Sequence, residues 1–270
     1  MKYSIALAEN MLICPSCHHH MITNTYQLSC RNCQQAYPIT NDIIHFFFDK
    51  KASTTKDSKV YAEKPKEDYW MKYQSNTGAT AYNQKYQNIQ KQRTMREKRI
   101  IRGLLESVGS VESILDLPSG GGRLSQILAK YARVLIEADI SAGQLSYAQQ
   151  NYQMDNPRLW LQAEALKNPL ADKSVDGVLC LRLSHHFHSP EEREKLLCEL
   201  LRVARHFVIF SFVDSHSVKN LWRSFWQRSK CNTMSTREIS QIAKKNAFKL
   251  TACPSIGHFR SHRYALIEKK

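Results

Sequence analysis

The chain has 270 residues, of which 42% are hydrophobic, which agrees with a soluble globular protein holding one substantial α/β core and a small appended module. It contains no apolar run near the ~20 residues of a membrane-spanning helix, and its start lacks the pattern of a secretory signal, so we expect a cytoplasmic protein with no membrane partner. The formal net charge of +15 arises in two segments, since residues 51–107 carry 13 basic against 6 acidic side chains and residues 219–270 carry 12 against 2. This excess suits an acidic partner such as RNA, or simply a solvated surface.

Two close cysteine pairs, CPSC and CRNC, lie near the N-terminus. Each pair can supply two thiolates to one tetrahedral ion, and zinc is the ion that this spacing favours over two disulfides or a redox pair. Because four sulfurs fill every coordination position, we expect a structural zinc and treat the three histidines at residues 18–20 as exposed bystanders. The expected metal ligands are Cys14, Cys17, Cys30 and Cys33.

The stretch after the second pair, QQAYPITNDIIHFFFD, carries Tyr37-Pro38-Ile39. With the cysteine pairs, it resembles a small zinc-ribbon family whose eukaryotic members activate tRNA and protein methyltransferases, and whose bacterial relatives are often fused to or encoded near methyltransferases. The resemblance covers about residues 11–48. It implies a zinc ribbon over residues 1–48 and a protein partner bound through it. Where that family usually has an Asp-Gly-Ile-Pro turn, residues 41–44 read NDII.

Residues 49–95 are expected to connect the ribbon to the core. Residues 49–68 are polar and charged and predict a linker. Five aromatic side chains then stand among polar ones, which indicates either a helix packed on the core or, less favoured, a lid over a ligand. These side chains are Tyr69, Trp70, Tyr73, Tyr82 and Tyr86. The pattern MREKRIIRGLLESVG predicts a helix that ends near Gly109.

The remainder alternates apolar strand segments with helical patterns. The predicted strands are SILDL, RVLIEADI, RLWLQAE, VDGVLCL and HFVIFSF, followed by NAFKLTACPSI and RYALIEKK. Helices are expected over residues 120–131 and 142–152, after a capping box at Ser189 and Glu192, in the stretch after the fifth strand, and after a second capping box at Ser235 and Glu238. This order predicts a doubly wound, mostly parallel sheet that binds its ligand beyond the carboxyl ends of the strands.

Three consecutive glycines in DLPSGGGR form the first strand-to-helix turn, where a ligand can approach bare backbone. Asp139 follows Gly120 by 19 residues and ends the second strand, where a carboxylate can accept both hydroxyls of a ribose. A dinucleotide enzyme shares this logic, but its third glycine position falls on Ser125. The nicotinamide fingerprint therefore fails.

Motif and strand order together resemble the class I S-adenosylmethionine-dependent methyltransferases of the type 11 subgroup, over about residues 96–270. The resemblance implies a seven-stranded Rossmann-like sheet. Pro118 replaces the first motif glycine, and the usual Pro-Gly-Gly before the fifth strand is missing. The implied cofactor-binding residues are Asp116, Pro118, Ser119, Gly120, Gly122, Asp139, Ile140, Glu164, Ala165 and Leu181.

Methyl transfer needs alignment and exclusion of water, and only sometimes a base. His185 and His186 follow the fourth strand and are weak candidates for a proton acceptor, although loop roles are favoured. A small metabolite is the first expectation for the methyl acceptor. Alternatives are rRNA or tRNA held by the basic flanks, and a non-catalytic module that binds the nucleoside and docks a partner through the ribbon.

Overall fold

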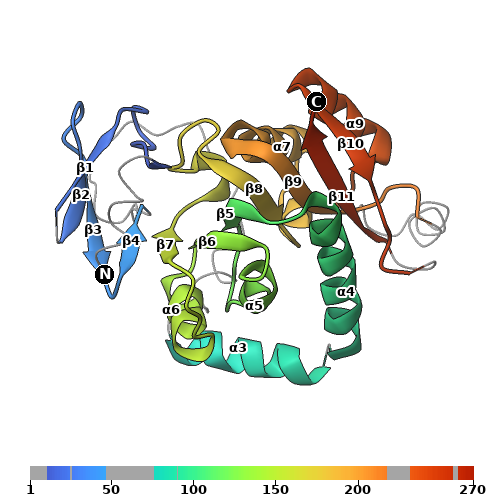
Figure 1. Cartoon of the computed structure of the whole chain (residues 1–270), viewed down its shortest axis with the longest axis horizontal. Coiled ribbons are helices and arrows are strands. Elements are labelled where there is room, and N and C mark those ends of the chain that lie inside the picture. The colour runs from blue at the N-terminus through green and yellow to red at the C-terminus, as the bar shows by residue number, and fades with distance from the viewer. Residues whose placement is uncertain (1–10, 25, 47–75, 90, 218–231, 258–260) are drawn as a thin grey trace.

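One mixed sheet joins the N-terminal and C-terminal parts of the chain (Figure 1). The structure is a computed structural model, and it describes residues 11–24, 26–46, 76–89, 91–217, 232–257 and 261–270. The strand order is β1-β2-β3-β4-β7-β6-β5-β8-β9-β11-β10.

The first four strands belong to the ribbon and the other seven to the core. The ribbon strands are β1 (Met21–Thr23), β2 (Gln27–Cys30), β3 (Ala36–Thr40) and β4 (Ile43–His45). The core strands are β5 (Val111–Asp116), β6 (Ala132–Asp139), β7 (Arg158–Gln162), β8 (Val175–Cys180), β9 (Ala204–Val213), β10 (Phe248–Ala252) and β11 (His262–Lys269). The core strands β5 to β9 are parallel, whereas β11 runs antiparallel to both β9 and β10.

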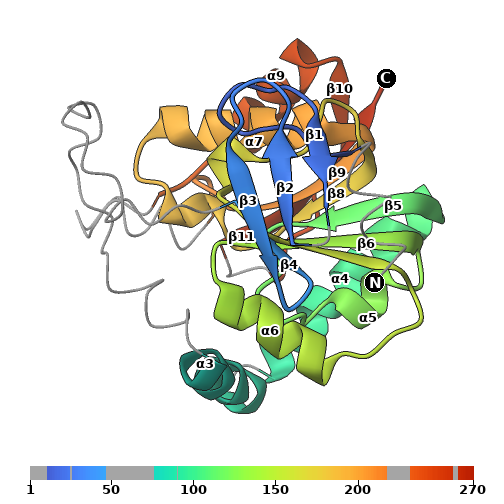
Figure 2. The same ribbon diagram turned by 90° about the vertical axis from the view of Figure 1, so that its left-hand side faces the viewer.

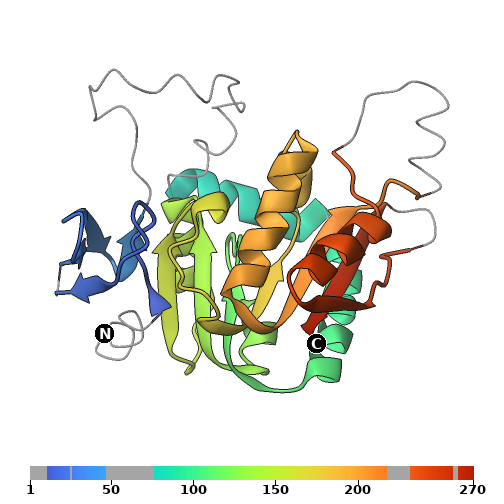
Figure 3. The same ribbon diagram turned by 90° about the horizontal axis from the view of Figure 1, so that it is seen from above.

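Helices cover both faces of the core sheet. They are α3 (Asn76–Ile89), α4 (Lys91–Val108), α5 (Ser125–Leu128), α6 (Ala142–Asn151), α7 (Pro190–Val203) and α9 (Thr236–Lys245), with 3-10 turns η2 (Ala165–Lys167) and η3 (Ser184–His186). Figure 3 shows α7 and α9 on one side of the sheet and α3 and α4 on the other. Alternate strand residues serve the two layers, so Leu115 packs beneath α7 while Ile114 packs beneath α4.

Local signals explain where these helices begin and end. Both predicted capping boxes are present, with the hydroxyls of Ser189 and Ser235 accepting from the backbone three residues later. Helix α4 ends before Gly109, whose φ of +85° and N–H bond to Leu105 O close its last turn. The predicted order of strands and helices is confirmed wherever the structure describes the core, whereas the helix predicted after the fifth strand falls on residues 218–231, outside the described residues.

The helix predicted over residues 120–131 is wrong in length, because α5 spans only Ser125–Leu128. Gly120 and Gly122 have φ values of +54° and +77°, which a right-handed helix does not allow. The glycines therefore form an open turn before the helix.

The prediction of a seven-stranded sheet is wrong, because the ribbon extends that sheet (Figure 2). Strand β4 pairs in parallel with β7, with Ile43 opposite Trp160 and His45 opposite Gln162. Tyr37 is fully buried in the same apolar cluster as strands of the core. The ribbon and the core thus share one hydrophobic interior.

Part of the predicted connector lies outside the described residues. This holds for the linker over residues 49–68, for Tyr69, Trp70 and Tyr73, and for the side chain of Tyr86. Most of the stretch between β9 and α9, at the other end of the core, also lies outside the described residues. Helix α3 carries Tyr82 and packs along α6. None of the described helices combines the length and apolar character that a membrane crossing requires.

Candidate cofactor and metal sites

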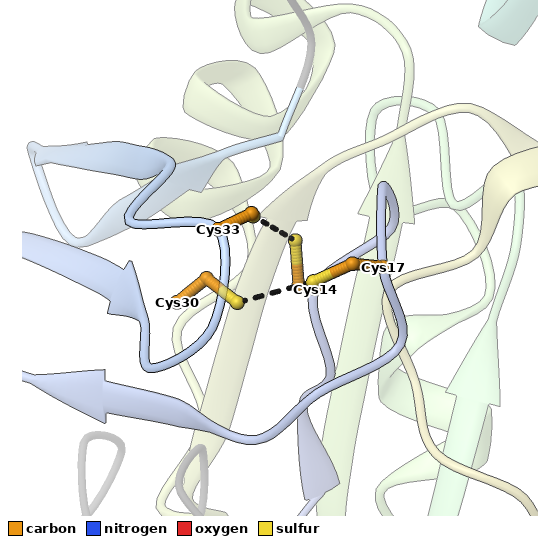
Figure 4. Close-up of side chains that lie close together, drawn as sticks. All are labelled: Cys14, Cys17, Cys30 and Cys33. Carbon is orange, nitrogen blue, oxygen red and sulfur yellow. Dashed lines mark hydrogen bonds between the residues drawn. The ribbon is translucent and has the colours of Figure 1, made fainter.

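Four thiols from two turns of the ribbon converge on one point (Figure 4). Their Sγ atoms all lie within 4.8 Å of one another, with Cys14 3.6 Å from Cys33 and Cys17 3.3 Å from Cys30. Zinc–sulfur bonds of about 2.3 Å place tetrahedral sulfurs about 3.8 Å apart. The four predicted ligands therefore fit one metal ion. The exposed ring of His19 lies 2.8 Å from the carbonyl oxygen of Cys17 and is not part of this cluster.

Hydrogen bonds prepare two of these sulfurs to be thiolates. The backbone N–H of His19 lowers the pKa of Cys17 to about 5. Burial alone would raise the pKa of Cys14, but the hydroxyl of Tyr37, 3.2 Å from its sulfur, and nearby backbone groups hold it below its ordinary value. Thiolate is the form that binds a metal. Tyr37 thereby ties the sulfur cluster to the buried interior.

The ribbon also holds both ends of the loop that follows β7. Before the loop, the N–H of Phe46 donates to the carbonyl of Gln162 at 2.8 Å. After the loop, the N–H of Ile13 donates to the carbonyl of Pro169 at 2.8 Å. Between these two bonds lies Glu164, which the sequence predicts as a cofactor contact. The ribbon is thus attached on both sides of a predicted part of the cofactor site.

The predicted cofactor residues gather at one edge of the core sheet. Asp116 ends β5, Asp139 ends β6, Glu164 follows β7 and Leu181 follows β8. These four strands are adjacent and parallel, in the order β7-β6-β5-β8, so their carboxyl ends meet at the same edge. Backbone bonds join the loops, since Ser119 N–H donates to Ala138 O at 2.9 Å and Ala163 N–H to Asp139 O at 3.0 Å.

The glycine turn is shaped by its neighbours. Gly120 and Gly122 adopt left-handed φ values, and the Leu117–Pro118 peptide before them is cis. At Gly121 an added Cβ would lie only 2.5 Å from the side-chain amide of Asn83 on α3. Asn83 also donates to Oε1 of Gln144, one turn into α6, at 2.8 Å. Helix α3 is therefore fitted directly onto the turn, a contact that the sequence analysis did not predict.

Asp139 joins the glycine turn to the end of β6. Its two carboxylate oxygens accept from Gly120 N–H at 2.8 Å and from Ser141 N–H at 2.9 Å. Burial raises the pKa of Asp139 to about 6, although those N–H bonds oppose the rise. Each carboxylate oxygen can accept a second hydrogen bond, so the pair can still bind the hydroxyls of a ribose.

Asp116 has a different environment. Its side chain is 3% exposed, and burial followed by the charge of Glu137 raises its pKa well above the ordinary value. A carboxyl group that keeps its proton can donate as well as accept a hydrogen bond. Cofactor contact by Asp116 remains a prediction, as it does for Pro118, Ser119, Ile140, Glu164, Ala165 and Leu181.

The two histidines proposed as proton acceptors form η3, directly after β8. The rings of His185 and His186 are 4.3 Å apart. Burial, followed by the charges of His186, His262, Arg93 and Arg182, lowers the pKa of His185 to about 4. Neutral His185 can accept a hydrogen bond near pH 7, but it is a weak base there. Its catalytic role stays a prediction.

A buried ion-pair network stands beside this edge and was missed from the sequence. Glu97 of α4 is 0% exposed and pairs with Arg123 at 2.5 Å and with Arg182 at 2.7 Å. The hydroxyl of Tyr264 on β11 donates to the same carboxylate at 2.9 Å. One signal was available in the sequence. Glu97 lies four residues before Ile101, so both are on the same, apolar face of the helix, where a charged side chain is expected to be buried and paired.

A cavity of about 110 Å³ lies elsewhere, between α7 and α9, where Pro190, Arg193, Met234 and Ile242 line part of its wall. Ligand pockets usually enclose about 300–1,000 Å³. This cavity also contains none of the predicted cofactor residues. The strand-end edge is therefore the better candidate for the functional site.

Comparison with known proteins agrees with this geometry. Residues 115–212 match a family model described as a methyltransferase domain, which begins at the end of β5 and ends within β9. A comparison with curated proteins gives no match for the chain.

Solved structures share the fold. Magnesium protoporphyrin IX methyltransferase from Synechocystis with bound S-adenosylmethionine has a TM-score of 0.60 at 18% identity, covering 77% of this chain and 99% of that one. An S-adenosylmethionine-dependent methyltransferase from Clostridium acetobutylicum has a TM-score of 0.55 at 12% identity, covering 70% and 98%. A chain from the complex of a Haloferax volcanii methyltransferase activator with a methyltransferase has a TM-score of 0.54 at 13% identity, covering 72% and 96%. The core thus has the Rossmann-like methyltransferase fold.

Proposed function

We propose that the protein is an S-adenosylmethionine-dependent methyltransferase that acts on a small metabolite. The observation that carries the proposal is the bond between Gly120 N–H and the carboxylate of Asp139, which joins the open turn to the acid at the end of β6. The methyltransferase-domain match over residues 115–212 supports it.

The residues at the strand ends fit the parts of this cofactor. Gly120 and Gly122 let the backbone approach the methionine portion, and Asp139 accepts the ribose hydroxyls. We propose Glu164, which follows β7, as the acceptor for the adenine amino group. S-adenosylmethionine, when bound, supplies a methyl group activated by its sulfonium. The chain itself orients the acceptor and excludes water, while neutral His185 is available to accept a proton.

A compact acceptor is favoured because fully buried side chains stand beside the glycine turn. Glu97 on the inner face of α4 and Tyr264 on β11 are both fully buried there. RNA stays the alternative acceptor, since the outward face of α4 carries exposed Arg99 and Arg102, which could contact phosphates.

The ribbon is proposed to hold a structural zinc ion, since four thiolates leave no position for a catalytic water. Its β4 pairs with β7 of the same chain. We therefore propose the core of this chain as the ribbon's binding partner, in place of a separate protein.

The test is to incubate the purified protein with radiolabelled S-adenosylmethionine and an extract of cells that lack this protein, and then to separate RNA, protein and small molecules. We expect label among the small molecules. The Asp139→Ala variant should give at least tenfold less label in this fraction. Asp155→Ala, which replaces an exposed acid in the loop between α6 and β7, should leave the label unchanged. Label in RNA would favour the RNA alternative over the metabolite proposal. If no fraction is labelled and the cofactor does not bind, the proposed methyltransferase activity is refuted.

A further inference from the structure

The inner face of α4 carries charge at one end and apolar side chains at the other. Arg93 and Glu97 are four residues apart and are followed on the same face by buried Ile101. Arg93 Nη2 lies 3.3 Å from Nε2 of His262, the first residue of β11. This charged end lies beside η3 and the glycine turn, at the edge where the proposed function places methyl transfer.

Positive charge exceeds negative charge at this corner. The single carboxylate of Glu97 already serves both Arg123 and Arg182. Burial alone would raise the pKa of Glu97, but those two arginines hold it below its ordinary value, so it is ionised. Arg93 adds a third guanidinium with no second carboxylate facing it among the described residues.

Arg93 itself is incompletely satisfied. Its Nε is shielded from solvent and has no hydrogen-bond partner within the described part of the chain. A shielded guanidinium N–H without an acceptor costs free energy, and the cost is greater for a charged group than for a neutral one. An anion at this point would supply the acceptor and part of the missing charge.

Two histidines lie close to Arg93 and to the positive charge of this corner. Because a guanidinium only donates, Nε2 of His262 can accept from Arg93 when that ring nitrogen carries no proton. The ring of His185 lies edge-on to His262, with centroids 5.9 Å apart. Burial is the main cause of the lowered pKa of His185, and the nearby charges of Arg93 and Arg182 lower it further, as expected in a locally positive environment.

We propose that Arg93 and His262 bind an anionic group, a carboxylate or a phosphate, of the methyl acceptor. This inference rests on the proposed function and names the class of its substrate, a small acid. Arg123 directly follows the glycine turn and is already paired with Glu97. Arg93 and His262 belong to α4 and β11, which carry none of the predicted cofactor residues. A bound sulfonium would strengthen the preference for an anion, because it adds a further positive charge.

Arg182, two residues after the end of β8, contributes to the same corner. It has a φ of +60°, unusual for arginine, and its N–H donates to Ser211 Oγ at 2.7 Å while its side chain reaches Glu97. Backbone held in this region is often found at ligand sites. Arg182 is thereby paired with Glu97 on α4, whereas Arg93 is the arginine that we assign to the anionic group of the methyl acceptor.

Calorimetry on the full-length protein separates this inference from the proposed function. S-adenosylhomocysteine is titrated first, and failure to bind would count against the cofactor site itself. The saturated protein is then titrated with inorganic phosphate and, separately, with succinate. We expect saturable binding of at least one anion, and the tighter of the two identifies the group.

Arg93→Gln is the test variant and Arg96→Gln, an exposed arginine on the outer face of the same helix, is its matched control. We expect at least tenfold weaker anion binding for Arg93→Gln, an unchanged value for Arg96→Gln, and unchanged affinity for S-adenosylhomocysteine in both. Arg93→Lys, which keeps the charge but loses the fork, should be intermediate. Absence of saturable anion binding, equal losses in Arg93→Gln and Arg96→Gln, or loss of S-adenosylhomocysteine affinity in Arg93→Gln would overturn the inference.

Discussion

The side-chain amide of Asn83 stands where a Cβ on Gly121 would have to go, with only 2.5 Å between that added carbon and the amide. Helix α3 is thereby fitted to the glycine turn, although its residues precede the core in the sequence. The contact makes the turn sensitive to substitution from both sides.

Gly121→Ala should weaken binding of S-adenosylhomocysteine at least fivefold, because its new methyl group pushes α3 or the turn aside. Asn83→Ala removes the obstructing amide. The double variant should therefore bind better than the sum of the single losses implies, by about 0.5–3 kcal/mol of coupling free energy. Calorimetry on the four proteins measures this, and strictly additive losses would show that the two residues do not meet.

Cofactor binding should weaken in mild acid. The folded-state pKa of Asp139 is raised to about 6 from 3.8, chiefly by burial, so in the ligand-free protein Asp139 favours folding below about pH 4 and loses that contribution as pH rises through 6. Ribose binding needs the carboxylate instead. We expect the affinity for S-adenosylhomocysteine to be constant above about pH 7 and to fall toward tenfold per unit below pH 6. Asp139→Asn should bind more weakly and lack this dependence, and an equally steep profile in that variant would assign the titration to another group.

Loss of the metal should weaken binding at the cofactor site. The ribbon bonds to Gln162 and Pro169, on either side of the loop that carries Glu164. We expect one zinc ion per chain by elemental analysis. Its removal by a chelator, or Cys17→Ser, should lower the melting temperature by several degrees and weaken S-adenosylhomocysteine binding about tenfold.

Cys198→Ser is the control for that experiment, because this thiol is partly buried on α7, away from the sulfur cluster. It should keep both its zinc and its affinity. A chelated protein with undiminished cofactor affinity would show that the ribbon does not position the loop.

Glu97→Gln should be strongly destabilising. It leaves Arg123 and Arg182 without their shared buried carboxylate, a change that costs about 3–5 kcal/mol. Glu112→Gln breaks an exposed pair with Arg133, which is worth about 0–1 kcal/mol. Urea denaturation of the two variants compares them directly, and similar midpoints would mean that the buried network does not hold α4 in place.

Much of this molecule is determined locally. The two cysteine pairs, the capping boxes at Ser189 and Ser235, and the stop at Gly109 each depend on residues a few positions apart, so the sequence was sufficient to place them. The acid at Asp139 was also predictable, because its distance from the glycines is set by one intervening strand-helix-strand unit.

The tertiary structure alone decided how the parts meet. His45 and Gln162 are 117 positions apart, yet their side chains lie 2.5 Å from each other where the ribbon joins the sheet. No sequence periodicity predicts this pairing, because β4 is a three-residue strand. Its partner is determined by the edge of β7, which would be unpaired without β4. The corner formed by Arg93, Glu97 and His262 is similar, since elements at opposite ends of the core supply it. Sequence spacing fixes what each element carries, and long-range packing determines which of those charges share one buried site.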